Sequence, residues 1–93
     1  MMDAYDILRL VCEQERVAPG AVCRISQRRA DAHARHLCWY LMHTCQGMRQ
    51  SDIAAWFDVD RRAVAWGVSR VEDRRDDPDF DARMTAIEDK LAG

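Results

Sequence analysis

Apolar residues recur at helical spacing through nearly the whole chain, and no segment alternates with period two for long enough to form a strand. The first helix is predicted over residues 4–16, with Asp3 as its N-cap. Its inner positions are Ile7, Leu8 and Val11. The sequence APG then breaks this helix, and Pro19, which suits a first helical position, opens a short helical turn that ends at Cys23.

A polar, arginine-rich loop over residues 24–31 leads into a long helix that is predicted over residues 31–46. Gly47 ends the long helix, because glycine readily takes the left-handed conformation that follows a helix. The inner face of the long helix is formed by Ala34, Leu37, Cys38, Leu41 and Cys45.

Three more helices are predicted in the second half of the chain. A short helix covers residues 50–57, Asp60 caps a helix over 61–76, and Pro78 separates this from a last helix over 79–91. Their apolar positions are Ile53, Trp56 and Phe57, then Val64, Val68 and Val71, then Phe80, Met84, Ile87 and Leu91. Two short helices joined by a tight turn are typical of a helix-turn-helix, although an ordinary helix pair has the same pattern. The sequence therefore predicts an all-α single domain over residues 1–93, with about six helices.

The outward face of the helix over 61–76 carries Arg62, Trp66 and Ser69. Arg61 and Arg62 begin this helix, where positive charge opposes the helix dipole at a cost of about 0.3–1 kcal/mol each. This placement favours an anionic ligand, and the alternative is a solvated pair balanced by Asp58 and Asp60. Trp66 is interpreted as a contact to DNA or to another protein, or as a residue buried under a neighbouring helix, and Arg62 lies at cation–π spacing from it.

The 93 residues, 48% of them hydrophobic, are sufficient for one small domain with one core. The acidic start MMDAYDILRL does not resemble a signal peptide, and no apolar run is long enough to cross a bilayer. We therefore expect a cytoplasmic protein without a membrane partner. The four cysteines have helical spacing and are interpreted as small buried hydrophobes rather than as disulfide partners; they are Cys12, Cys23, Cys38 and Cys45.

Charge is distributed unevenly along the chain, although the net charge is only −2. Residues 1–70 hold ten arginines and eight acids, whereas residues 71–93 hold four basic residues and eight acids. The acids of VEDRRDDPDFD are interpreted as a solvated face. The stretch 24–35 carries four arginines against Asp31 alone, and a local basic patch favours a polyanionic partner.

Metal binding and catalysis find little support in the sequence. The candidate ligands are His33, His36, His43, Cys38 and Cys45, but they lack the two groups of closely spaced pairs that structural zinc sites use. No Ser-His-Asp pattern, activated cysteine or Gly-rich phosphate loop is present. The sequence predicts a protein that is not an enzyme and that needs no metal, cofactor or nucleotide.

Three stretches, AHARHLCWYL, SDIAAWFDVDRRAVAWGVSRVED and RRDDPDFDARMTAIEDKLA, carry a resemblance to a known family. They resemble the long helix, the helix-turn-helix and the last helix of the C-terminal DNA-binding domain of the bacterial replication initiator DnaA. The resemblance extends from about Tyr5 to Ala92, without the ATPase module. It implies a Trp-repressor-like helix-turn-helix with a preceding basic loop, and double-stranded DNA as the partner.

The resemblance also implies roles for individual residues. It places the capping aspartate at Asp60 and the base-reading run at Arg61, Arg62 and Ala63. It places a DNA-contacting arginine of the long helix at Arg35 and a late basic residue of the recognition helix at Arg70. Arg28 and Arg29 are the nearest candidates for the arginine that the family inserts into the minor groove, and a solvated loop is the alternative for Arg28, Arg29 and Arg35.

Several positions depart from the family pattern. Val59 replaces an arginine, the turn is one residue shorter, and Arg-Arg-Ala replaces His-Thr-Thr. Because arginine prefers guanine whereas a threonine methyl contacts thymine, the preferred DNA sequence is expected to differ. The predicted function is duplex DNA binding that regulates replication initiation or transcription, at the nucleoid. The alternative is a protein-interaction module that self-associates or binds a replication protein through Trp66 and Trp39.

Overall fold

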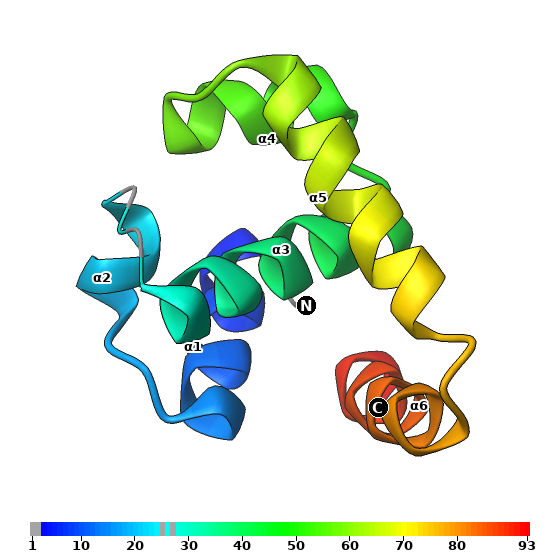
Figure 1. Cartoon of the computed structure of the whole chain (residues 1–93). Coiled ribbons are helices and arrows are strands. Elements are labelled where there is room, and N and C mark those ends of the chain that lie inside the picture. Colours follow the sequence, from blue (N-terminus) through cyan, green and yellow to red (C-terminus); the bar gives the residue numbers. More distant parts are fainter. Residues whose placement is uncertain (1–2, 25, 27) are drawn as a thin grey trace.

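The computed structural model describes residues 3–24, 26 and 28–93, and within these ranges the regular secondary structure is helical, without a strand. The all-α prediction is thereby confirmed, and the described residues form six helices (Figure 1). Their bounds are α1 Ala4–Glu15, α2 Pro19–Cys23, α3 Arg29–Thr44, α4 Gln50–Phe57, α5 Arg61–Arg74 and α6 Pro78–Ala92.

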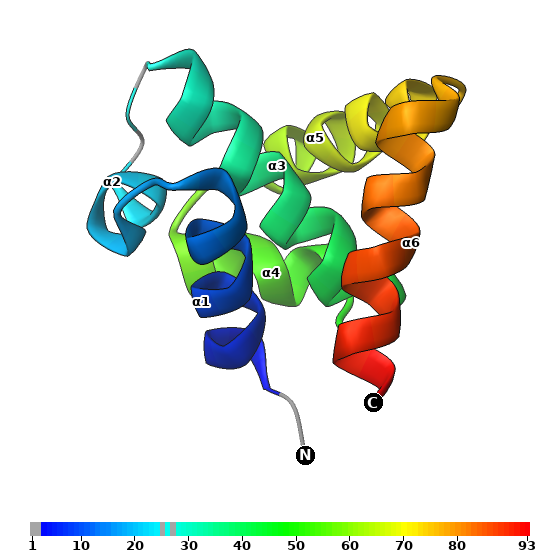
Figure 2. The ribbon, with the colours of Figure 1, turned by 90° about the horizontal axis from the view of Figure 1, so that it is seen from below.

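Helix α3 is the centre of the fold, since it contacts α1, α2, α4 and α5 (Figure 1). Its central residues Leu37, Cys38 and Leu41 are therefore buried on several sides and form the middle of one continuous core. Figure 2 shows α6 along one side of the molecule, with α1 and α3 beside each other.

Local capping interactions fix the starts of three helices. Asp3 and Asp6 form a capping box at the start of α1. The carboxylate of Asp60 accepts the backbone N–H of Arg62 at 2.7 Å at the start of α5, as predicted. Asp77 caps α6 in the same manner, so Pro78 is the first residue of this helix rather than a separator before it.

The predicted basic loop over residues 24–31 is too long, because α3 begins at Arg29. Arg29 is thus a helical residue, and Asp31 lies in the first turn of α3, where it is buried and accepts the Ser26 hydroxyl at 2.9 Å. Two helices end two residues earlier than predicted. Helix α3 ends at Thr44 instead of residue 46, and α5 ends at Arg74 instead of residue 76.

The α3–α5 contact depends on a glycine. A Cβ atom at Gly67 would lie 2.7 Å from Cε3 of Trp39 and 2.8 Å from Cδ2 of His36. Any side chain at this position would push the two helices apart. The predicted valine stripe of α5 then packs inward, with Val64, Val68 and Val71 all buried.

The side chain of Arg75 forms hydrogen bonds to α6 and to α3. Its guanidinium donates to Asp81, to Glu88 at 3.0 Å, to the Tyr40 hydroxyl at 3.1 Å and to the Thr85 hydroxyl at 3.1 Å. The hydrogen bond to Glu88 raises the pKa of Arg75, with further contributions from Asp81 and Tyr40. The inner positions of α6 that pack below this arginine are Phe80, Met84 and Ile87.

The interpretation of all four cysteines as buried hydrophobes is wrong for two of them. Cys12 and Cys38 are buried, and burial raises the pKa of both thiols, that of Cys12 to about 11. Cys23 and Cys45 are exposed, because each lies at the end of its helix, where the chain turns away from the core.

Candidate nucleic-acid interface

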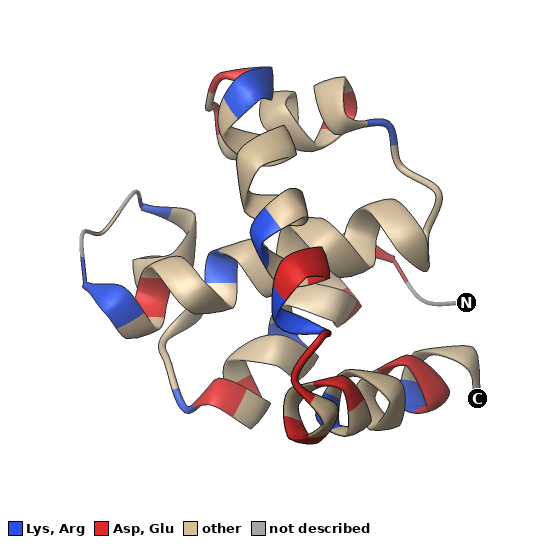
Figure 3. Ribbon diagram, turned by 45° about the vertical axis from the view of Figure 1, so that its right-hand side comes forward, with Lys and Arg blue, Asp and Glu red and all other residues tan. Residues whose placement is uncertain are grey.

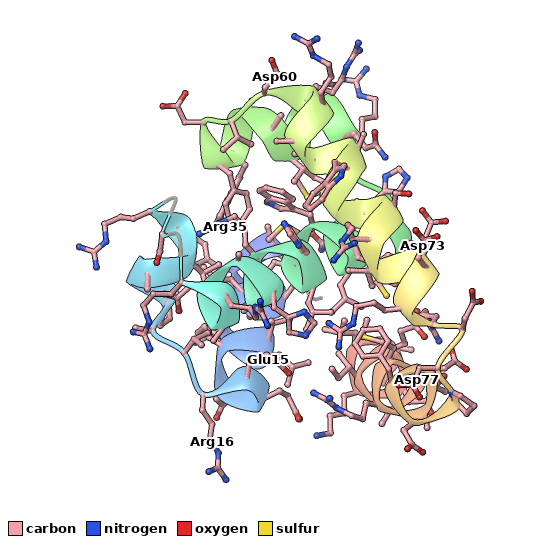
Figure 4. All side chains as sticks on the ribbon, in the orientation of Figure 1. Glu15, Arg16, Arg35, Asp60, Asp73 and Asp77 are labelled. Carbon is pink, nitrogen blue, oxygen red and sulfur yellow. The ribbon has the colours of Figure 1, made fainter. Side chains whose placement is uncertain are left out.

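The α4–α5 turn presents the start of α5 at the surface. Helix α4 ends in a left-handed residue, Asp58, with φ of 56°, and Asp60 then caps α5 (Figure 4). Only residues 58–60 separate the two helices. The first three residues of α5, Arg61, Arg62 and Ala63, are all exposed.

The outward face of α5 carries aromatic and basic side chains. Trp66 is 58% exposed, which agrees with an outward position and not with burial under a neighbouring helix. The guanidinium of Arg70 lies 5.2 Å from the Trp66 ring centroid, so Arg70 is the cation–π partner of this indole. The predicted partner Arg62 is instead drawn to Asp60, at 3.5 Å, because the cap places that carboxylate beside it.

A groove of about 830 Å³ runs between the first half of α3 and the second half of α5. We call this the α3–α5 groove. Arg29, His33 and His36 line it from α3, at positions i, i+4 and i+7, and Trp66, Arg70 and Arg74 line it from α5, at i, i+4 and i+8. Glu15 of α1 closes one end.

The α3–α5 groove is predominantly positive. Among the residues that the structure describes, neither Arg29 nor Arg70 is paired with a carboxylate. Arg74 donates to the ring of His33, which lies 3.5 Å from Glu15, and Glu15 also accepts from Arg83 at 3.1 Å. The single carboxylate of the groove is thus already neutralised, whereas two of its arginines are available to an anion.

The two histidines of the groove are held neutral. Burial, reinforced by Arg74, Arg83 and His36, lowers the pKa of His33 to about 4. Burial, with Arg35 and Arg70, also lowers the pKa of His36. The His36 ring contacts both Trp66 and Trp39, with centroids 5.4 Å and 5.6 Å away. These neutral rings contribute hydrogen-bonding groups and apolar surface to the groove, while its charge comes from arginine.

Arg35 is buried, whereas the resemblance implied that it contacts DNA. It is 4% exposed, and its guanidinium donates to the backbone oxygens of Val22 at 2.9 Å, Arg24 at 3.1 Å and Ser26 at 3.2 Å. Figure 4 shows Arg35 on the side of α3 that faces α2. Arg35 is turned inward because three carbonyl groups of the α2–α3 connection need a donor there. Its position makes it a support for the basic connection.

Like Arg24, Arg28 is an exposed arginine of this connection. Its Nε lies 4.0 Å from the carboxylate of Asp31, and its side chain is 81% exposed. Arg28 and Arg29 therefore differ in setting, since Arg28 precedes α3 and Arg29 lines the α3–α5 groove. Figure 3 shows basic segments on this part of the chain and on α5, and acidic segments along the α5–α6 connection and α6.

Trp39 cannot form a protein-binding surface with Trp66, because it is buried between α3, α4 and α5. The sequence interpretation missed the groove-lining roles of His33, His36 and Arg74. A signal for them was present, since residues 29, 33 and 36 share one helical face of α3, but a histidine on a helix is compatible with many environments.

Among the described residues, no group of three or more His, Cys, Asp or Glu side chains is placed to hold a metal ion. No helix in the described ranges is long and apolar enough to cross a membrane.

Comparisons with protein-family models, with curated proteins and with solved structures give no significant match to this chain.

Proposed function

We propose that this protein binds double-stranded DNA, with α4 and α5 as a helix-turn-helix and α5 in the major groove. The observation that supports this most strongly is the two-sided character of α5. Its valines are buried, whereas Arg61, Arg62, Trp66 and Arg70 are exposed and extend from its first turn toward its last. A helix-turn-helix brings such leading side chains to base edges.

The spacing along α5 fits the dimensions of DNA. Arg62 and Arg70 are eight residues apart, which is about 12 Å along a helix axis. The major groove of B-DNA is also about 12 Å wide. With Arg61 and Arg62 at base edges, Arg70 reaches the phosphates at the border of the groove, and Trp66 lies between them against sugar or a thymine methyl.

The α2–α3 connection supplies a second contact. Arg28 is its candidate for the phosphates or for the adjacent minor groove, and Arg35 holds the connection in place from inside the protein. The hydrogen bonds from Arg35 restrain Arg24 and Ser26 before binding, which lowers the conformational entropy that these residues lose when a ligand binds. In this proposal the protein regulates replication initiation or transcription at the nucleoid.

The deciding experiment is selection of binding sites from random duplexes, followed by titration of the selected site. Arg61→Ala or Arg62→Ala should lower affinity and flatten the preference for guanine at one position, by about 1–3 kcal/mol of discrimination. Arg9→Ala on α1 is the matched control, since Arg9 is an exposed arginine that pairs only with Asp6. The logarithm of affinity should fall with log salt with a slope of about −3 to −5. Binding that is insensitive to salt, or no selected sequence, would contradict the proposal.

A second candidate function is protein binding, and one observation favours it. Tyr5 of α1 and Trp56 of α4 are both exposed and in edge-to-face contact, with centroids 5.6 Å apart. Exposed aromatic pairs are typical of interfaces. If the protein fails to bind duplexes at low salt but self-associates, and Trp56→Ala abolishes this association, the second function replaces the first.

A further inference from the structure

We propose that the α3–α5 groove binds single-stranded DNA, with an unpaired base stacked on Trp66 and phosphates held by Arg29 and Arg70. This goes beyond duplex recognition, because the leading arginines of α5, Arg61 and Arg62, do not line the groove. The two activities share Trp66 and Arg70, so a bound single strand excludes a bound duplex.

The chemistry of the groove matches the requirements of a single strand. Proteins that bind single-stranded nucleic acid combine a positive groove that follows the backbone with aromatic side chains that stack on bases. Trp66 is a half-exposed indole that lines the groove, and it is flanked by the neutral ring of His36 and the guanidinium of Arg70. Both aromatic rings and guanidinium planes stack on unpaired bases.

The charges of the groove are arranged on its two walls. Arg29 lies on α3 and Arg70 on α5, and neither is neutralised by a carboxylate in the part of the chain that the structure describes. Arg74, at the far end, is engaged by His33 and lies 4.2 Å from the Phe80 ring centroid. The free anion-binding capacity therefore lies on both walls of the groove, with Arg70 one helical turn from Trp66 and Arg29 on the opposite wall.

The geometry favours an unpaired strand over a duplex at this position. The faces of duplex bases are covered by their neighbours, so an indole inside a groove can stack only on a base that has left the helix. From Trp66 to Arg74 the groove wall of α5 spans about 12 Å, by the helical rise of about 1.5 Å per residue. This length accommodates about three nucleotides at a stacked spacing of about 3.4 Å.

The test uses a fluorescent oligothymidylate of about 16 nucleotides, titrated with the full chain at low salt. Trp66→Ala should weaken binding by at least about five-fold, as expected for the loss of one stacked base. The double variant Arg29→Ala, Arg70→Ala should also weaken it, and the salt slope should fall in magnitude by about 0.7 per lost phosphate contact. Trp66→Phe, which keeps an aromatic ring, should retain most of the affinity.

The matched control is the double variant Arg9→Ala, Arg49→Ala, which removes two exposed arginines that do not line the groove and should bind the oligothymidylate as well as the unchanged protein does. The same variants are titrated with the selected duplex, so that failure of duplex recognition is scored separately from failure of the groove. No binding of the oligothymidylate, or equal binding by Trp66→Ala after circular dichroism shows it folded, would overturn the proposal. A loss in the double variant Arg61→Ala, Arg62→Ala as large as in the groove variants would also overturn it, since the strand would then lie on the leading end of α5.

Discussion

Gly67 on α5 faces the indole of Trp39 on α3 so closely that no methyl group fits between them. A Cβ atom at Gly67 would approach the Trp39 ring to 2.7 Å. This glycine thus sets the distance between the helix at the centre of the core and the helix that carries the candidate interface. Trp39 is buried, so its ring cannot move aside into solvent.

Gly67→Ala should therefore destabilise the protein, although alanine is the better helix former. Overpacking costs about 1–3 kcal/mol, and the gain in helix propensity offsets about 1 kcal/mol of this. We expect a net loss of up to about 2 kcal/mol in the free energy of urea-induced unfolding. Gly20→Ala is the control, because nothing lies within 4 Å of a Cβ atom there. Equal stability of the two variants would show that the helices can separate freely.

Arg35→Lys should loosen the α2–α3 connection. The planar guanidinium of Arg35 donates to the backbone oxygens of Val22, Arg24 and Ser26. The ammonium group of a lysine cannot reproduce this arrangement of donors. Leaving buried acceptors unsatisfied costs about 1–3 kcal/mol. Faster amide hydrogen exchange at Ser26 and Arg28 and weaker binding to every duplex are the expected results. Unchanged exchange would remove the supporting role that we assign to Arg35.

Arg75→Met should weaken the attachment of α6. The substitution leaves the partly buried Glu88 and the Tyr40 hydroxyl without their shared donor, and we expect a loss of about 2 kcal/mol. Arg83→Met is the control, since Arg83 is 60% exposed and pairs with Glu15 alone within the described part of the chain. Solvent screens a pair with an exposed partner, so we expect a smaller loss in this variant than in Arg75→Met. Limited proteolysis should cut the α5–α6 connection faster in Arg75→Met alone, and similar rates in both variants would speak against a special role for Arg75.

His33 should make stability depend on acidity. Its folded-state pKa of about 4 lies below the ordinary 6.5, so the unfolded chain binds the extra proton between these values. The neutral ring therefore stabilises the fold above pH 6.5, and this contribution is lost as the pH falls toward 4. Glu15, 3.5 Å away, favours the protonated ring, but burial and Arg74 outweigh it. Across that range the loss amounts to about 3 kcal/mol at most.

Unfolding of the unchanged protein and of His33→Gln at several pH values checks this expectation. Other groups titrate in both proteins, so the difference between the two curves isolates His33. The stability of the unchanged protein relative to that of His33→Gln should fall as the pH is lowered from 7 to 4, and parallel curves would mean that folding does not shift the pKa of this ring.

The six helices, and the capped starts of α1 and α5, could be predicted from the sequence, because they depend on interactions within one turn. The caps Asp3 and Asp60 act on backbone N–H groups two or three residues away, and the valine stripe of α5 follows helical spacing. The helix ends were less predictable, since no single residue type specified where α3 and α5 stop.

The roles of charged and aromatic residues were not predictable in the same way. Arg35 is turned inward by carbonyl groups of a connection whose path the sequence does not reveal. The sequence predicts a helix around both Trp39 and Trp66. In the fold, Gly67 lets α5 pack against Trp39, which is buried, whereas Trp66 on the outer face of α5 is exposed. The cation–π partner of Trp66 is Arg70 rather than Arg62, because Arg62 forms an ion pair with the carboxylate of Asp60. Each outcome depends on an element distant in sequence or on competition for one partner.

The two arginines at the start of α5 imply a trade-off between stability and ligand affinity. Arg61 places a positive charge at the positive end of a helix dipole, and among the described residues it has no carboxylate partner. The free protein is consequently less stable than its fold would allow, and a bound polyanion removes the unfavourable interaction. Selection for thermal stability alone would replace Arg61 with an acidic residue, and under the proposed function the stabilised variant would bind nucleic acid less tightly.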